Sequence, residues 1–138
     1  MLGLNPYLTF PGTCEEAFKF YEKTLGGRIE AMIPHEGTPA ADFVPGDWRA
    51  KIMHARLVVD GEAIMGSDSP PQYQQKPAGF SVSLNLSDAA KGKGIFEALS
   101  EGGEIKMPFQ ETFWAKGFGM VVDRFGTPWM VNCEQKAV

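Results

Sequence analysis

Residues 13–29, TCEEAFKFYEKTLGGRI, carry the strongest structural signal in the chain. Residues 89–105, AAKGKGIFEALSEGGEI, repeat their pattern of a helical stretch followed by Gly-Gly. An offset of 76 residues aligns the Gly-Gly pairs of the two segments and places Phe96 on Phe20. Similar segments at a fixed spacing indicate that one supersecondary unit has been used twice. We therefore treat the chain as two copies of one unit.

The first copy predicts a helix from Thr13 to Leu25. Thr13 is the expected N-cap, and Glu16, three residues later, would complete a capping box. Apolar side chains recur at helical spacing along this segment. The predicted buried face consists of Ala17, Phe20, Tyr21 and Leu25.

The second copy predicts a matching helix, with Ser87 or Asp88 as its N-cap. Its predicted buried stripe consists of Ile95, Phe96 and Leu99. Gly26 and Gly102 stand where the two helices should stop, and glycine is favoured at that position because the backbone there is often left-handed. Both helices are therefore predicted to end at these glycines.

An extended run follows each helix, at residues 28–33 and 104–109. The first copy then has the longer loop, roughly residues 34–49, which is rich in Gly, Pro and Ala. The match resumes at an offset of 63, where residues 57–60 pair with residues 120–123. Each copy thus predicts two further strands after the loop.

A glycine lies in the turn between each of these strands and the last strand of its copy. It is Gly61 before residues 62–68 and Gly126 before residues 127–134. A linker rich in Pro and Gln, around residues 69–77, separates the copies. The prediction is an α+β fold of duplicated βαβββ units. With one helix per unit, the helices should cover one face of the sheets and leave a concave face, which is a natural site for a small molecule.

Size and charge restrict the classes of function. The chain has 138 residues, 43% of them hydrophobic, which fits a single domain over residues 1–138 with repeats at about 4–68 and 78–135. Its net charge is −4 and its Lys and Arg residues are scattered, so no nucleic-acid partner is expected.

The sequence shows no signal peptide and no membrane-spanning segment, so we expect a cytoplasmic protein. Cys14 and Cys133 lie far apart without a zinc-binding pattern and are expected to be buried or idle.

Nearly the whole chain resembles the vicinal-oxygen-chelate superfamily of glyoxalases, bleomycin-resistance proteins and extradiol dioxygenases, in particular its PhnB-like group. The segments that carry the resemblance are 6–10 (PYLTF), 20–26 (FYEKTLG), 53–55 (MHA), 67–68 (SD), 110–119 (QETFWAKGFG) and 123–132 (DRFGTPWMVN). The resemblance implies a U-shaped, mixed-sheet cavity that often holds a divalent metal, with ligands on the first and last strands of each unit. It also implies a homodimer, in line with the frequency of twofold assemblies.

The metal ligands implied by the resemblance do not carry over to this sequence. Counting from the helices and glycines places them at Asn5 or Pro6, between Phe80 and Val82, near Met65, and at Met130. None of these is a histidine or a carboxylate, which divalent ions need. We expect no cofactor, with an unusual divalent-metal site as the alternative. The group also carries a demethylubiquinone methyltransferase label, but the chain has no Gly-rich loop after a first parallel strand, so we do not expect that activity.

His54 is the first candidate catalytic residue. Strand alternation places it with Arg56 on one face of its strand and Met53, Ala55 and Leu57 on the other. A lone strand histidine is often only a hydrogen-bonded structural residue. The resemblance favours a functional role, with His54 catalytic and Arg56 binding ligand.

Glu111 and Trp114 lie in the aromatic segment of the second copy. Glu111 is a candidate acid or base, because a carboxylate beside aromatic rings can have a raised pKa, or else it binds backbone amides. Trp114 is either a ligand-binding residue or part of an aromatic plug. Met130 and Asn132 share a face of the last strand, and Asn132 could orient a ligand by hydrogen bonds.

Two further positions are less specific. Asp68 is predicted either to bind ligand or to form a turn, and turn formation is the simpler reading. His35 and its neighbour Glu36, in the long loop, are candidates to close over a ligand.

Three hypotheses for the function follow. The first is a small-molecule-binding protein, potentially an enzyme, that lacks the standard metal and uses His54, Arg56, Glu111, Trp114 and Asn132. The second is a module that sequesters a drug or toxin. The third is a metal-dependent lyase or dioxygenase with unusual ligands such as His54 and Glu111. Metal content and turnover of a bound compound distinguish the three.

Overall fold

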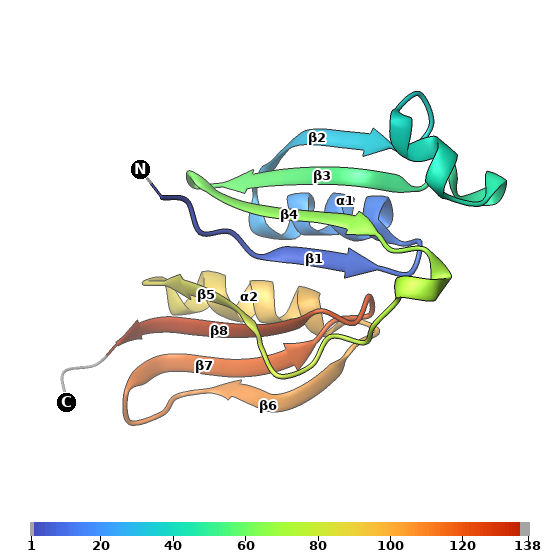
Figure 1. Cartoon of the computed structure of the whole chain (residues 1–138). Helices are drawn as coiled ribbons and strands as arrows, with labels where there is room; N and C mark the ends of the chain where they lie inside the picture. Colours follow the sequence, from blue (N-terminus) through green and yellow to red (C-terminus); the bar gives the residue numbers. More distant parts are fainter. Residues whose placement is uncertain (1, 136–138) are drawn as a thin grey trace. The chain divides into compact units, whose positions relative to one another are not determined.

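The computed structural model describes residues 2–135, and the chain divides after Gln75 into two compact units. Each unit contains one α-helix and one four-stranded mixed sheet (Figure 1). This arrangement confirms the α+β fold of duplicated βαβββ units. Within the described residues, no helix is long and apolar enough to cross a membrane.

In the first unit, the elements follow the order strand, helix and three strands. They are β1 (Tyr7–Phe10), α1 (Cys14–Leu25), β2 (Arg28–Pro34), β3 (Ile52–Val59) and β4 (Glu62–Asp68). The sheet order is β1-β4-β3-β2, with β1 parallel to β4 and the other pairs antiparallel. The long loop between β2 and β3 contains two short 3-10 helices, Pro39–Phe43 and Gly46–Trp48.

The second unit repeats this order. Its elements are β5 (Val82–Leu86), α2 (Ala89–Ser100), β6 (Glu104–Gln110), β7 (Ala115–Val122) and β8 (Pro128–Gln135). The sheet order is β5-β8-β7-β6, again with the first strand parallel to the last. The linker carries a third 3-10 turn, Pro71–Tyr73.

In each unit the helix packs on one face of its sheet and makes the core there (Figure 1). In the first unit Phe10, Phe18 and Tyr21 are at most 2% exposed. The ring centroids of Phe10 and Phe18 lie 6.1 Å apart, edge to face. Phe20, which the sequence placed on the buried face, is only half-buried, so Phe18 takes the core position instead.

The start of α1 differs from the predicted capping box. Thr13 occupies the N-cap position, but its side chain makes no capping hydrogen bond. Asp68, from the end of β4, takes over, because its Oδ1 accepts from the N–H groups of Gly12 at 3.0 Å and Cys14 at 2.9 Å. Asp68, which is distant in sequence, therefore caps α1 in place of the Thr13 side chain.

The start of α2 follows the prediction. Asp88 is the N-cap, and its Oδ1 accepts from the N–H groups of Ala90 at 3.0 Å and Lys91 at 3.1 Å. Of the two candidates that the sequence offered, Asp88 is the one that caps. The two helices therefore begin by different means although they occupy equivalent places.

The ends of the helices also differ slightly. Gly26 follows α1 directly with a φ of 75°, in the left-handed region that favours glycine, as predicted. In α2 the C-cap is Glu101, and Gly102, with a φ of 73°, comes one residue later. The prediction that Gly102 itself ends the helix is therefore wrong by one residue.

The offset of 63 between β3 and β7 is also wrong by one residue. It pairs Leu57 with Met120, but Leu57 is fully buried on the helix side and Met120 is half-buried on the opposite face. Val121, 1% exposed, shares the orientation of Leu57. A slip of one residue reverses the face of every side chain in a strand, so the offset of 64 describes the fold.

A close approach between helix and sheet shapes the second core. A Cβ added to Gly92 of α2 would collide with Sγ of Cys133 on β8. In the same unit Trp129 is fully buried, and its Nε1 donates to Asp123 Oδ2 at 2.8 Å. Glycine at position 92 therefore lets the helix lie against the sheet.

Candidate functional site

The first sheet has one face that α1 does not cover. Strand register places Tyr7 of β1 beside Met65 of β4, and Met65 beside Arg56 of β3. His54 lies two residues before Arg56 on the same strand and shares its face. We call this set, Tyr7, His54, Arg56 and Met65, the first helix-free face.

His54 is engaged by Tyr7 across this face. The hydroxyl of Tyr7 lies 3.3 Å from Nδ1 of His54, and the two rings stack with centroids 5.9 Å apart. If the hydroxyl donates, the neutral imidazole carries its proton on Nε2. No other described residue hydrogen-bonds this ring, so Nε2 is available to another molecule.

Arg56 takes part in a small charged group. Its Nε lies 3.3 Å from Oε1 of Glu30, while Arg28 lies 3.0 Å from the other oxygen of the same carboxylate. The Arg56 side chain is 41% exposed, so its ion pair is screened and weak. Its Nη1 also lies 3.8 Å from the sulfur of Met65. The guanidinium is held over the face but retains donors for an acceptor group.

The second sheet presents an equivalent face with different chemistry. Register places Phe118 of β7 beside Asn132 of β8, and Asn132 beside Asn85 of β5. The neighbouring row is Met120, Met130 and Ser83. We call these six residues the second helix-free face.

Trp114 adjoins the second helix-free face. Its ring centroid lies 5.3 Å from that of Phe118 and 4.9 Å from that of Phe113, both edge to face. Phe113 is 78% exposed and Phe118 only 9%. The aromatic segment therefore runs from a buried ring to an exposed one, which suits a surface that stacks on a ligand rather than a sealed plug.

Glu111 lies on the turn between β6 and β7 with an exposed side chain. On the same turn, the hydroxyl of Thr112 accepts from the N–H groups of Trp114 at 3.3 Å and Ala115 at 3.1 Å. The catalytic role of Glu111 stays a prediction.

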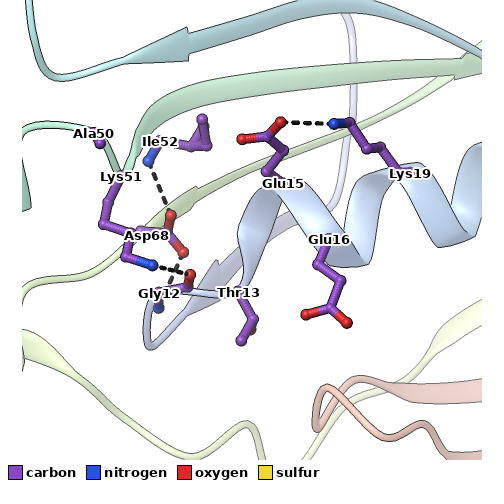
Figure 2. A pocket seen from close by; sticks show the side chains of 9 residues that line it. All are labelled: Gly12, Thr13, Glu15, Glu16, Lys19, Ala50, Lys51, Ile52 and Asp68. Carbon is purple, nitrogen blue, oxygen red and sulfur yellow. Dashed lines mark hydrogen bonds and ion pairs between the residues drawn. The ribbon is translucent and has the colours of Figure 1, made fainter.

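Asp68 lies on the helix side of the first sheet, in a depression of about 510 Å³ at the N-terminal end of α1. Besides the two amides at the start of α1, its Oδ2 accepts from the N–H of Ile52 at 2.9 Å. Figure 2 shows this carboxylate between Gly12 and Ile52, with the ammonium of Lys51 donating to the carbonyl oxygen of Gly12. This geometry favours the turn-forming reading of Asp68 over a ligand-binding one.

The depression itself offers few groups to a ligand. Its polar atoms mostly bind one another, including Lys19 with Glu15 at 2.7 Å (Figure 2). This depression is thus a structural junction, and the helix-free faces carry more of the chemistry that a binding site needs.

His35 does not lie ready to close over a ligand. It is 6% exposed, and both its backbone N–H and its Nδ1 lie within hydrogen-bond distance of the carbonyl oxygen of Lys51, at 3.0 and 2.9 Å. Its own carbonyl accepts from Thr38. The residue fixes the loop to the start of β3, which corrects the expectation of a mobile lid residue.

The donor groups at the superfamily's metal positions do not fit a divalent ion. The register makes Met65 and Met130 equivalent, since each lies beside the first strand of its unit, next to Tyr7 and Ser83. A thioether is a poor ligand for hard ions, and the Arg56 cation lies against Met65. Among residues 2–135, no three His, Cys, Asp or Glu side chains form a group that could hold a metal.

Sequence reasoning missed several members of these faces. Tyr7, Glu30, Ser83 and Asn85 were not singled out. Alternation along β1 and β5 places Tyr7, Ser83 and Asn85 on the helix-free side, but only the register shows which strands they adjoin.

Comparison with known proteins agrees with the fold. The family described as 3-demethylubiquinone-9 3-methyltransferase matches residues 3–132. Protein YjdN of Escherichia coli strain K12 is 38% identical over 95% of each chain.

Solved structures extend the comparison. Protein PA1353 of Pseudomonas aeruginosa is 50% identical, covers 99% of this chain and 100% of its own, and has a TM-score of 0.89. The PhnB protein of Bacillus cereus, at 24% identity, 96% and 99% coverage and a TM-score of 0.77, shares the fold. The chain therefore belongs to the family described as 3-demethylubiquinone-9 3-methyltransferase.

Proposed function

We propose that this protein binds a small organic molecule at the helix-free faces of its sheets, without the superfamily's standard metal, and that His54 is the acid–base group. The observation that carries the proposal is the Tyr7–His54 contact of 3.3 Å beside Arg56. Two titratable groups and a cation on one sheet face, opposite the core, form the kind of polar cluster that binding sites use.

The imidazole of His54 can donate a proton from one ring nitrogen and accept one at the other. Tyr7 holds its Nδ1, so Nε2 is the nitrogen that would exchange a proton with a ligand. Fixing one ring nitrogen by a hydrogen bond sets both the tautomer and the orientation of the ring. Tyr7 is therefore a positioning residue in this proposal.

Arg56 would bind an acceptor group of the ligand. Its guanidinium keeps donors beyond the single Nε contact to Glu30. A carboxylate or phosphonate could engage such donors in pairs, which lysine cannot do. A ligand anion would compete with Glu30 for Arg56, and the partial exposure of that pair keeps the competition weak.

On the second unit, Trp114, Met130 and Asn132 are the proposed ligand-binding residues, and Glu111 is a second candidate acid or base. Support for the first three is their place on or beside one sheet face. Glu111 rests only on its position in the aromatic segment, and Asp68 is no longer favoured because backbone amides occupy its oxygens.

A fragment titration followed by amide NMR tests the proposal. The library should contain anionic, cationic and neutral compounds, and shifts are expected at Tyr7, His54 and Arg56. His54→Gln and Arg56→Met should weaken the binding of fragments that shift these residues by about tenfold. Lys19→Gln, an exposed change on α1, is the matched control. Binding that neither site variant alters would contradict the proposal.

Sequestration without turnover is the second candidate function. The edge-to-face rings of Phe113, Trp114 and Phe118 favour it, because aromatic surfaces hold planar compounds without any reaction. Recovery of the bound compound unchanged after long incubation would favour sequestration. Conversion that His54→Gln abolishes would favour an enzyme.

A cytoplasmic homodimer completes the proposal. The dimer is supported by the assembly habits of the superfamily that the sequence resembles and by the frequency of twofold assemblies. Light scattering of the purified protein should give twice the mass of the chain, and a monomer at all concentrations would contradict the dimer.

A further inference from the structure

One hydrogen-bond acceptor on the second helix-free face has no partner. The side-chain oxygen of Asn132 is buried, and none of residues 2–135 donates to it. Native structures rarely leave a buried polar atom unpaired without a reason. The amide nitrogen of the same side chain is occupied, because it donates to Oδ1 of Asn85 at 3.4 Å. The protein thus presents an acceptor for a donor that it does not itself supply.

The neighbouring amide fixes which end of Asn132 is unpaired. Nδ2 of Asn85 donates to Oγ of Ser83 at 3.3 Å, so Asn85 turns its oxygen toward Asn132. Only the NH₂ group of Asn132 can meet an oxygen, so the acceptor must be the free end. In this arrangement Asn132 donates to Asn85 and Asn85 donates to Ser83.

The surroundings of this acceptor are aromatic and apolar. Phe118 lies directly beside Asn132 in register, and Trp114 packs against Phe118. The adjacent row supplies Met120 and Met130, whose flexible, polarisable side chains adapt to flat ligands. Across the sheet, the face thus changes from rings and thioethers on β7 to amides and a hydroxyl on β5.

We propose that the second helix-free face binds a planar, unsaturated ring that carries an N–H or O–H donor on its edge. The donor is bound by Oδ1 of Asn132, and the ring packs on Phe118, Trp114 and Met130. This inference rests on the proposed small-molecule function and names the ligand class for one of the two sheets. It concerns this sheet alone and assigns no role to His54.

Two isosteric probes test the donor requirement. 2-Quinolinone has a ring N–H, and coumarin has the same shape with an oxygen in its place. Titration of the full-length, isotope-labelled chain should show 2-quinolinone binding about tenfold more tightly than coumarin. The amide signals of Asn85, Phe118 and Asn132 should shift on binding.

Two variants separate the polar contact from the stacking contact. Asn132→Leu should abolish the preference for 2-quinolinone over coumarin, while Trp114→Ala should weaken both probes to a similar extent. Asn132→Leu should unfold at about the same temperature as the wild type, because removing the unpaired buried acceptor offsets the lost hydrogen bond to Asn85, whose exposed oxygen can be hydrated instead. This stability measurement shows that any loss of preference does not come from a damaged fold.

The inference would be overturned by equal affinity for the two probes, by no binding of either probe, or by shifts confined to the first helix-free face. The last of these would leave the proposed small-molecule function standing, since the fragment titration at His54 tests that function separately. A preference that survives in Asn132→Leu would likewise overturn the role of the acceptor.

Discussion

Asp68 combines three backbone contacts in one buried side chain. Its carboxylate accepts from the N–H groups of Gly12, Cys14 and Ile52, and so it connects the end of β4 with the start of α1 and the start of β3. Hydrogen bonds to a charged acceptor are stronger than those between neutral groups. Removing the acceptor also leaves the donors that it satisfied in a buried setting.

Asp68→Ala should therefore lower the free energy of unfolding by about 3 kcal/mol. Asp68→Asn should lower it too, because the amide NH₂ cannot accept from a backbone N–H. Glu16→Ala, which removes an exposed carboxylate from the same depression, should change it by less than about 0.5 kcal/mol. Chemical denaturation of the three variants checks this, and equal losses for Asp68 and Glu16 would refute it.

The thiol of Cys14 predicts an alkaline limit to stability. Burial raises the pKa of this thiol strongly, and the charges of Asp68 and Glu15 raise it further. The unfolded thiol ionises near pH 8.5, below the folded one, so the contribution to stability is complete below that pH and is lost as the pH rises above it.

Between pH 8.5 and 10 the wild type should lose up to about 1.4 kcal/mol of stability per pH unit from this one group. Cys14→Ala, although less stable at neutral pH, should lack that part of the pH dependence. Denaturation curves of both proteins across this range measure the difference. Parallel pH profiles would show that the thiol does not contribute.

At the scale of elements, the two helices show which sequence signals can be trusted. Apolar spacing and the Gly-Gly pairs predicted both helices, and the structure contains both. Local capping was predicted correctly for Asp88, whose oxygen and amide partners are three residues apart at most, but not for Thr13. The partner of the α1 amides is Asp68, more than fifty residues away, and no local pattern shows that pairing.

This contrast gives a matched pair of substitutions. Asp88→Ala should lower the free energy of unfolding by about 1 kcal/mol because it removes the cap of α2. Thr13→Ala should cost less than about 0.5 kcal/mol because its side chain makes no capping bond. Thermal unfolding of both variants measures these losses. A larger loss of stability for Thr13→Ala than for Asp88→Ala would contradict this expectation and support the predicted capping box at Thr13.

The contact between α2 and β8 gives a second test at this scale. Alanine is a better helix former than glycine by about 1 kcal/mol, so Gly92→Ala would stabilise an isolated helix. In the fold, its Cβ would collide with Cys133, and we expect a net loss of about 2 kcal/mol. In a Cys133→Ala background the same change should cost far less. A double-mutant cycle with no coupling would contradict the close approach.

At the scale of the whole molecule, the two units share the same order of elements and strands, but they carry different side chains on their helix-free faces. Equivalent rows hold Tyr7, Met65 and Arg56 in one unit, and Ser83, Met130 and Met120 in the other. The repeat predicted the fold because hydrophobic spacing and glycines are local features. The sites could be predicted only in part, since His54, Arg56 and Asn132 were found by alternation while their partners depend on strand register. The offset error at β7 has the same origin.

The measurement that bears most directly on the central claim is elemental analysis of the purified protein before and after chelation, with His54→Ala alongside. The superfamily positions hold methionines, and a guanidinium lies against one of them. We therefore predict no stoichiometric divalent metal in either protein. One metal per chain that chelation removes and that His54→Ala fails to bind would contradict the account and make His54 a metal ligand.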